Sequence, residues 1–75
     1  MLLREFEIDG CIIRLSEIND IFVAEVVNGD GEKILHREFS DYEPIKNSFN
    51  QIVQEYETDK ISIDRVLEIL ENTKS

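Results

Sequence analysis

The spacing of apolar residues changes once along this chain, near Phe39, and this change limits the folds that it can adopt. Before Phe39, apolar and polar residues tend to alternate, which is typical of strands with one buried face. After Phe39, apolar residues recur every three or four positions, which is typical of amphipathic helices. The sequence therefore predicts strands followed by helices, in an α+β domain.

Turn signals divide the first part of the chain into strands. Asp9-Gly10 is a strong hairpin signal, because a type I′ turn needs positive φ at both central residues. Asn19-Asp20 is a weaker signal of the same kind, and Asn28–Gly31 marks a third turn. Two or four residues in the third turn would both direct Leu35 and Phe39 to the core, whereas an odd number would invert them. The predicted strands are Leu2–Ile8, Cys11–Ile18, Ile21–Val27 and Glu32–Phe39.

Two helices are predicted after the strands. Ser40 and Glu43 have the spacing of a capping box, in which each side chain accepts a hydrogen bond from a backbone N–H at the helix start. Pro44 suits the first turn, where its missing N–H removes no intrahelical bond. Ser62 is the predicted N-cap of the second helix. The apolar stripes consist of Tyr42, Ile45, Phe49, Ile52, Val53 and Tyr56, and then of Ile63, Val66, Leu67 and Leu70.

The chain length permits one domain with one thin core layer. A chain of this size buries only about 60% of its unfolded surface, which leaves little room for a deep pocket. We therefore predict a single α+β domain over residues 1–75. It consists of a three- to four-stranded antiparallel β-meander followed by two α-helices (ββββαα) packed on one sheet face.

Two-residue turns at Asp9-Gly10 and Asn19-Asp20 would determine the register of the first three strands, because paired residue numbers then add up to 19 and 39. On the sheet face opposite the core, which we call the outer face, this register places Arg14 between Glu5 and Glu25. Such alternation of charge across strands supports the register. The predicted core face consists of Leu2, Phe6, Ile8, Cys11, Ile13, Leu15, Phe22, Ala24 and Val26.

The outer face is more apolar than a solvated sheet face usually is. Two short helices can cover one face of such a sheet but hardly both. Either the helices divide between the two faces, or these apolar side chains are scattered and exposed singly, or the outer face is an interface. An interface would take a second copy of the chain or a partner protein, since contiguous exposed apolar patches mark such sites. The candidate interface residues are Leu3, Ile12, Ile18, Ile21, Val23 and Val27.

Charge and composition restrict the partners and the compartment. The net charge of −9 disfavours direct binding of nucleic acid, because phosphate binding depends on Lys and Arg. No apolar run approaches the roughly 20 residues that span a bilayer, and Met1–Arg4 lacks a signal-peptide pattern, so no membrane association is expected. Cys11, the single cysteine, cannot form an internal disulfide, which favours the reducing cytoplasm.

Neither catalysis nor a cofactor is expected. His36 is the only histidine, and the predicted register places it two strands away from the core residue Cys11, too far for a Cys-His nucleophile pair. One Cys and one His are too few for a zinc site, and Asn28–Glu32 lacks the full ligand sequence of a calcium loop. The sequence therefore favours a non-enzymatic binding module without metal or cofactor. An enzyme assembled at an oligomer interface is the least favoured alternative.

The surplus of acidic residues suggests another function. Carboxylates spaced over a rigid body can imitate a phosphate backbone and occupy the groove of a basic nucleic-acid-binding protein. In size, charge and element order the chain resembles small acidic phage-encoded inhibitors of CRISPR nucleases or restriction enzymes, several of which are DNA mimics. The resemblance implies a basic DNA- or RNA-binding protein as partner; otherwise the acidic residues serve solubility alone. The candidate mimic carboxylates are Glu55, Glu57, Asp59, Asp64, Glu68 and Glu71.

Overall fold

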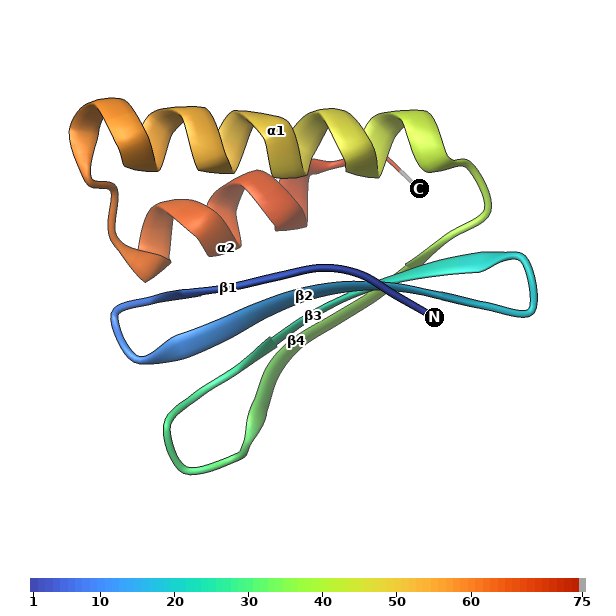
Figure 1. Cartoon of the computed structure of the whole chain (residues 1–75), viewed down its shortest axis with the longest axis horizontal. Coiled ribbons are helices and arrows are strands. Elements are labelled where there is room, and N and C mark those ends of the chain that lie inside the picture. Colours follow the sequence, from blue (N-terminus) through green and yellow to red (C-terminus); the bar gives the residue numbers. More distant parts are fainter. Residues whose placement is uncertain (75) are drawn as a thin grey trace.

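The computed structural model describes residues 1–74, so Ser75, the last residue of the predicted domain, lies outside the described residues. The strands form one antiparallel sheet in the order β1-β2-β3-β4. Figure 1 shows both helices on the same side of this sheet. The predicted ββββαα arrangement is therefore confirmed. The elements are β1 (Leu2–Ile8), β2 (Cys11–Ile18), β3 (Ile21–Val27), β4 (Lys33–Phe39), α1 (Tyr42–Asp59) and α2 (Ile63–Asn72).

The first two turns adopt the predicted backbone conformation. Asp9 and Gly10 have φ angles of 53° and 77°, and Asn19 and Asp20 have φ angles of 52° and 68°. Positive φ at both central residues is the requirement of a type I′ turn, and Asn and Asp tolerate it better than most residues. The second turn therefore forms without glycine.

The third turn has an odd number of residues, yet the core face of β4 is not inverted. The N–H of Gly31 donates to Asn28 O at 3.0 Å, and the N–H of Asn28 donates to Glu32 O at 2.9 Å, which leaves three residues in the loop. A register shift then follows, because Val27 pairs with Lys33 whereas Val26 pairs with Leu35. The extra residue in β4 restores the alternation, so Leu35 and Phe39 still point into the core.

A second register shift corrects the prediction for the start of β1. Leu2 pairs with Ser16 and Arg4 pairs with Leu15, so Leu3 is an extra residue in the strand. Leu2 was predicted in the core but lies opposite Ser16 on the outer face, where it is 52% exposed. Leu3 was predicted on the outer face but packs against the core. Both errors have the same cause, because one additional residue reverses the side-chain alternation beyond it.

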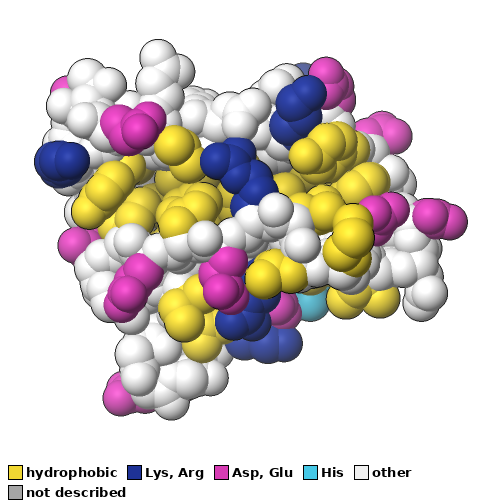
Figure 2. Space-filling view, in the orientation of Figure 1, with side chains coloured by type: hydrophobic (Ala, Val, Ile, Leu, Met, Phe, Trp, Pro, Cys, Tyr) yellow, Lys and Arg dark blue, Asp and Glu magenta, His cyan; other side chains and the backbone are white. Residues whose placement is uncertain are grey.

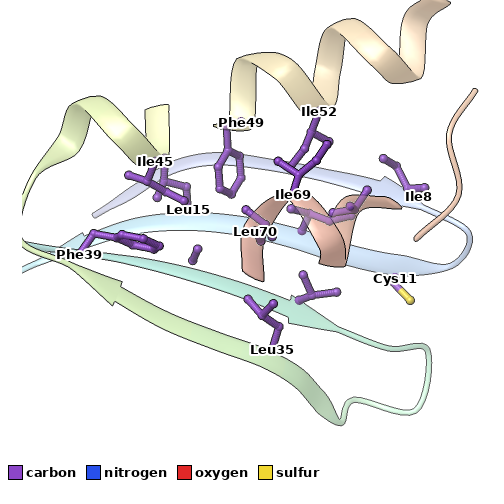
Figure 3. Close-up of a cluster of buried hydrophobic side chains, with 14 residues drawn as sticks. Ile8, Cys11, Leu15, Leu35, Phe39, Ile45, Phe49, Ile52, Ile69 and Leu70 are labelled. Carbon is purple, nitrogen blue, oxygen red and sulfur yellow. The ribbon is translucent and has the colours of Figure 1, made fainter. Parts of the chain in front are cut away.

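The core lies between the sheet and the helices. Figure 3 shows the side chains of Phe49 from α1 and Leu70 from α2 within this layer, above Leu15 and Leu35 of the sheet. Phe49 is fully buried and meets the ring of Phe6 edge-on, with 5.9 Å between the ring centroids. One continuous apolar cluster therefore joins both helices to the same face of the sheet.

The predicted capping box at Ser40 does not form. The N-cap of α1 is Asp41, whose side chain makes no capping hydrogen bond, and Glu43 is the second helical residue. Since β4 stays extended up to the buried Phe39, the chain needs Ser40 and Asp41 to leave the sheet before the helix begins. Pro44 still falls in the first turn, as predicted.

Ser62 is the N-cap of α2, as predicted, but the capping hydrogen bond comes from elsewhere in the chain. The carboxylate of Asp9, in the β1–β2 turn, accepts a hydrogen bond of 2.8 Å from the N–H of Ile63. An acidic group at this end also interacts favourably with the helix dipole. The first turn of the sheet thus holds the start of α2.

The other end of α2 is held by Arg37 on β4. Its Nη1 atom lies 2.7 Å from Leu70 O and 2.5 Å from Thr73 O. Leu70 belongs to the last turn of the helix and Thr73 is its C-cap; Leu70 O also accepts a longer hydrogen bond of 3.4 Å from the N–H of Thr73. Arg37 therefore connects the sheet to the C-terminal end of α2.

None of the helices formed by residues 1–74 is both long and apolar enough to cross a membrane.

Candidate functional site on the outer face of the sheet

A row of charged side chains crosses the outer face through all four strands. Glu5 pairs with Arg14, Arg14 pairs with Glu25, and Glu25 pairs with His36. We call these four residues the charged row. Its sign alternates from strand to strand when His36 is protonated.

The contacts within the charged row differ in part from the prediction. Arg14 Nε donates to Glu5 Oε2 at 2.9 Å, as expected. Glu25 was expected to share Arg14 but instead contacts Lys33 Nζ at 2.8 Å and His36 Nδ1 at 2.9 Å. The register shift in β4 explains this difference, because it places Lys33 opposite Val27, diagonal to Glu25.

These contacts shift the pKa values of two groups in opposite directions. The hydrogen bond from Lys33, followed by that from His36, holds the pKa of Glu25 below its ordinary value of 4.5. Hydrogen bonds to Glu38 and to Glu25 raise the pKa of His36 above 6.5. His36 Nε2 lies 3.0 Å from Glu38 Oε2, so both ring nitrogens face a carboxylate. The charged form of the ring satisfies both contacts, since only imidazolium has two N–H donors.

We expect the contribution of His36 to stability to depend on pH. Because its pKa is raised in the folded state, the contribution is present below the unfolded pKa near 6.5 and is lost as the pH rises through the folded pKa. His36→Gln should therefore lower the melting temperature more at about pH 5.5 than at about pH 8.5. Calorimetry of both proteins at both pH values measures this difference. The wild type and the variant are compared at the same pH, so the general effect of pH on the melting temperature is common to both. A melting-temperature difference that is equal at both pH values would contradict the prediction.

Apolar side chains flank the charged row on both sides. On one side Ile12 pairs with Val27; on the other side Ile18 pairs with Ile21, and Val23 follows two residues along β3. Val23, which pairs with Ser16 and Glu38, is only 7% exposed, so it is already buried in the single chain. A hollow of about 390 Å³ opens beside it, with Ile18, Ile21, Glu25 and His36 among its lining residues.

The structure places the predicted interface residues on the outer face, with the exception of Leu3. Ile12, Ile18, Ile21, Val23 and Val27 occupy the expected positions. The register shift replaces Leu3 by Leu2 on this face. The sequence prediction missed two further features of the site. The charged row divides the apolar residues into two groups, and Lys33 forms an ion pair with Glu25.

The predicted mimic carboxylates do not form one set of free charges. Glu55 accepts two hydrogen bonds from Arg65, of 2.9 Å and 3.0 Å, which lower its pKa to about 2. Arg65 also donates to Glu68 at 2.6 Å. The remaining four, Glu57, Asp59, Asp64 and Glu71, are exposed on and beside the helices. Arg65 thus neutralises part of the acidic surface while it connects α2 to α1.

Cys11 and His36 lie on opposite faces of the sheet. Cys11 is buried in the core cluster, whereas His36 belongs to the charged row. The pair therefore cannot act together as nucleophile and base.

Comparison with protein-family models, with curated proteins and with solved structures gave no match to this chain.

Proposed function

We propose that this chain is a small acidic, non-enzymatic binding module that acts through protein–protein contact, and that a second copy of the chain occupies its outer face. The observation that carries the proposal is the position of the helices. Both cover the same sheet face, which leaves the apolar side chains of the outer face without a helix over them. Exposed apolar surface of this kind is typical of interfaces.

The order of charges along the charged row favours a second copy as the partner. Closed dimers have two-fold symmetry, and two packed sheets keep their strands nearly aligned. A two-fold axis that runs parallel to the strands, between the two sheets, sets β1 against β4 and β2 against β3. Glu5 then faces the partner's His36, and Arg14 faces the partner's Glu25. Opposite charges meet because the row reads with alternating sign from either end.

The same arrangement also brings matching residues together outside the charged row. Ile12 lies over the partner's Val27, and Ile18 lies over the partner's Ile21, because each pair shares one row of the sheet. Glu7, which shares a row with Lys33, faces the partner's Lys33. These apolar and opposite-charge contacts support self-association through this face, although in one row Leu2 faces the partner's Glu38 and Ser16 faces the partner's Val23.

We expect Ile18→Lys to disrupt the dimer. Ile18 is 54% exposed in the single chain, so a lysine there leaves the fold intact. In the dimer each copy would lose the burial of one isoleucine, worth about 1.5–3 kcal/mol, so the dissociation constant should rise at least about 100-fold. Sedimentation equilibrium over a range of concentrations measures the change.

The matched control is Gln54→Lys, which makes the same charge change on the exposed side of α1. The wild type and this control should sediment as dimers, also at high salt, because apolar burial is screened only weakly. A monomeric wild type at high concentration would overturn the self-association proposal. If that monomer bound a basic nucleic-acid-binding protein at a rate that fell steeply with ionic strength, mimicry by the carboxylates would be the better proposal.

A further inference from the structure

A second surface, distinct from the outer face, lies along the free edge of β1. In the strand order β1-β2-β3-β4, β1 has only one neighbour. Every second residue of such a strand directs its backbone N–H and C=O away from the sheet, where another strand can pair with them. A groove of about 490 Å³ follows this edge between β1 and α1. The edge therefore combines unpaired backbone groups with a concave surface.

The floor of the groove is apolar and rigid. It includes Leu3 and Phe6 from β1 and Val53 and Tyr56 from α1. Leu3 and Phe6 pack against the core, and Phe6 contacts the buried ring of Phe49. Figure 2 shows hydrophobic side chains at the surface between the helices and the sheet, with charged side chains beside them. The side chains of an added strand that point toward the helices would lie on this floor.

The rim of the groove is acidic. Glu5, Glu7 and Glu57 line it together with one basic residue, Arg4. Arg4 donates a hydrogen bond of 2.7 Å to Asn50, and Glu5 is paired with Arg14. Within residues 1–74, Glu7 and Glu57 form no ion pair, so their charges are available to a ligand. The rim is therefore complementary to Lys or Arg side chains.

A second copy of the chain does not suit this edge. Two-fold antiparallel pairing of β1 with itself sets outer-face residues of one strand against those of the other. A register centred on Glu5 sets Glu5 against its own equivalent, and a register centred on Phe6 sets Glu5 against Glu7 of the other copy; like charges directly opposite are destabilising. The acidic edge thus favours a basic strand from a different protein.

We propose that the groove between β1 and α1 binds an extended segment of another protein, in which apolar residues alternate with Lys or Arg. The segment pairs with β1 as an additional strand. Its apolar side chains lie on the floor at Phe6, Val53 and Tyr56, and its basic side chains lie on the outer-face side beside Glu5 and Glu7. Backbone pairing supplies affinity and the alternate side chains supply specificity, as in other cases of strand addition. The groove does not require the dimer, but it shares Glu5 and Glu7 with the proposed dimer contact, so a variant that disrupts the dimer is included in the test.

The test uses a fluorescently labelled peptide of eight residues in which Val and Lys alternate, titrated with the full chain by anisotropy. We expect measurable binding in the micromolar range, and no binding of a matched peptide in which Val and Glu alternate. Methylation of the backbone nitrogens on the pairing edge of the Val–Lys peptide should abolish binding. Equal binding of the Val–Glu peptide would overturn the charge argument, and unchanged binding of the methylated peptide would overturn strand addition.

Two pairs of variants locate the peptide on the chain. Tyr56→Ala should weaken binding about tenfold, as loss of an aromatic contact in an interface does, whereas Tyr42→Ala should leave it unchanged. Both tyrosines lie on α1 and are similarly exposed, at 37% and 39%, but only Tyr56 lines the groove. Glu7→Lys should weaken binding more than Glu71→Lys, which makes the same charge change outside the groove.

The Ile18→Lys variant, which should disrupt the dimer, distinguishes a failure of the groove proposal from a failure of the proposed function. Ile18→Lys should bind the Val–Lys peptide at least as tightly as the wild type does, because Ile18 does not line the groove and loss of the dimer leaves Glu5 and Glu7 free for the peptide. Amide chemical shifts should change along β1 and the second half of α1. Shift changes confined to β3 and β4, or absence of binding at millimolar protein, would overturn the groove proposal whatever the oligomeric state.

Discussion

Phe49→Ala is expected to lower the free energy of unfolding by about 3–5 kcal/mol, because it deletes a fully buried aromatic ring from a thin core. A chain of this length has a total stability of about 4–11 kcal/mol, so the substitution should remove a large part of that stability. Phe49 contacts Phe6 and thereby joins α1 to the edge of the sheet. Urea denaturation followed by circular dichroism measures the change.

Two further variants of α1 serve as comparisons for Phe49→Ala. Ile52→Val removes one methylene from the same buried side of α1 and should cost about 0.5–1.5 kcal/mol, which leaves a folded protein to measure. Gln54→Ala changes an exposed position of the same helix and should stay within about 0.5 kcal/mol of the wild type. A loss below about 1 kcal/mol for Phe49→Ala would contradict the central place of this ring in the core.

Arg37→Met should be the second most damaging change, with a loss of about 1.5–3 kcal/mol, because it removes charge-assisted hydrogen bonds from the end of α2. Arg37 donates to Leu70 O and Thr73 O, and its guanidinium also lies 4.8 Å from the ring centre of Phe39. The C-terminal end of α2 should loosen before the rest of the fold. Amide hydrogen exchange measures this as a selective loss of protection in α2.

Arg37→Lys tests whether geometry or charge is responsible. Lysine keeps the charge but carries a single ammonium group on a flexible stem, so it should restore only part of the protection. Lys46→Met, which removes a partly exposed charge from α1, serves as the control and should leave α2 unaffected. If exchange in α2 stayed the same in Arg37→Met, the anchoring role of Arg37 would be wrong.

The proposed site could be predicted in outline but not in detail. The type I′ turns and the alternation of side chains placed Ile12, Val23 and Val27 on the outer face correctly. The extra residue at Leu3 was not predicted, because nothing local distinguishes it from the strand residues on either side. Lys33 was missed as the partner of Glu25 because its position depends on a register shift in another strand.

The contacts of Arg37 could likewise not be predicted from the sequence. Its position between Leu35 and Phe39 placed it on the core side of β4, which is unusual for a charged residue. Its partners, however, are backbone carbonyls more than thirty residues later in the chain. No spacing in the sequence connects β4 with the end of α2.

The sequence by itself determined the features that depend on interactions between neighbouring residues. Positive φ at Asp9-Gly10 and the change of apolar period near Phe39 depend on neighbouring residues alone, and they define the strands, the turns and the helices. The tertiary structure decided which sheet face both helices cover, how the charged row pairs, and which edge carries a groove. These depend on how separate elements pack, because side chains distant in sequence meet only after the core has closed.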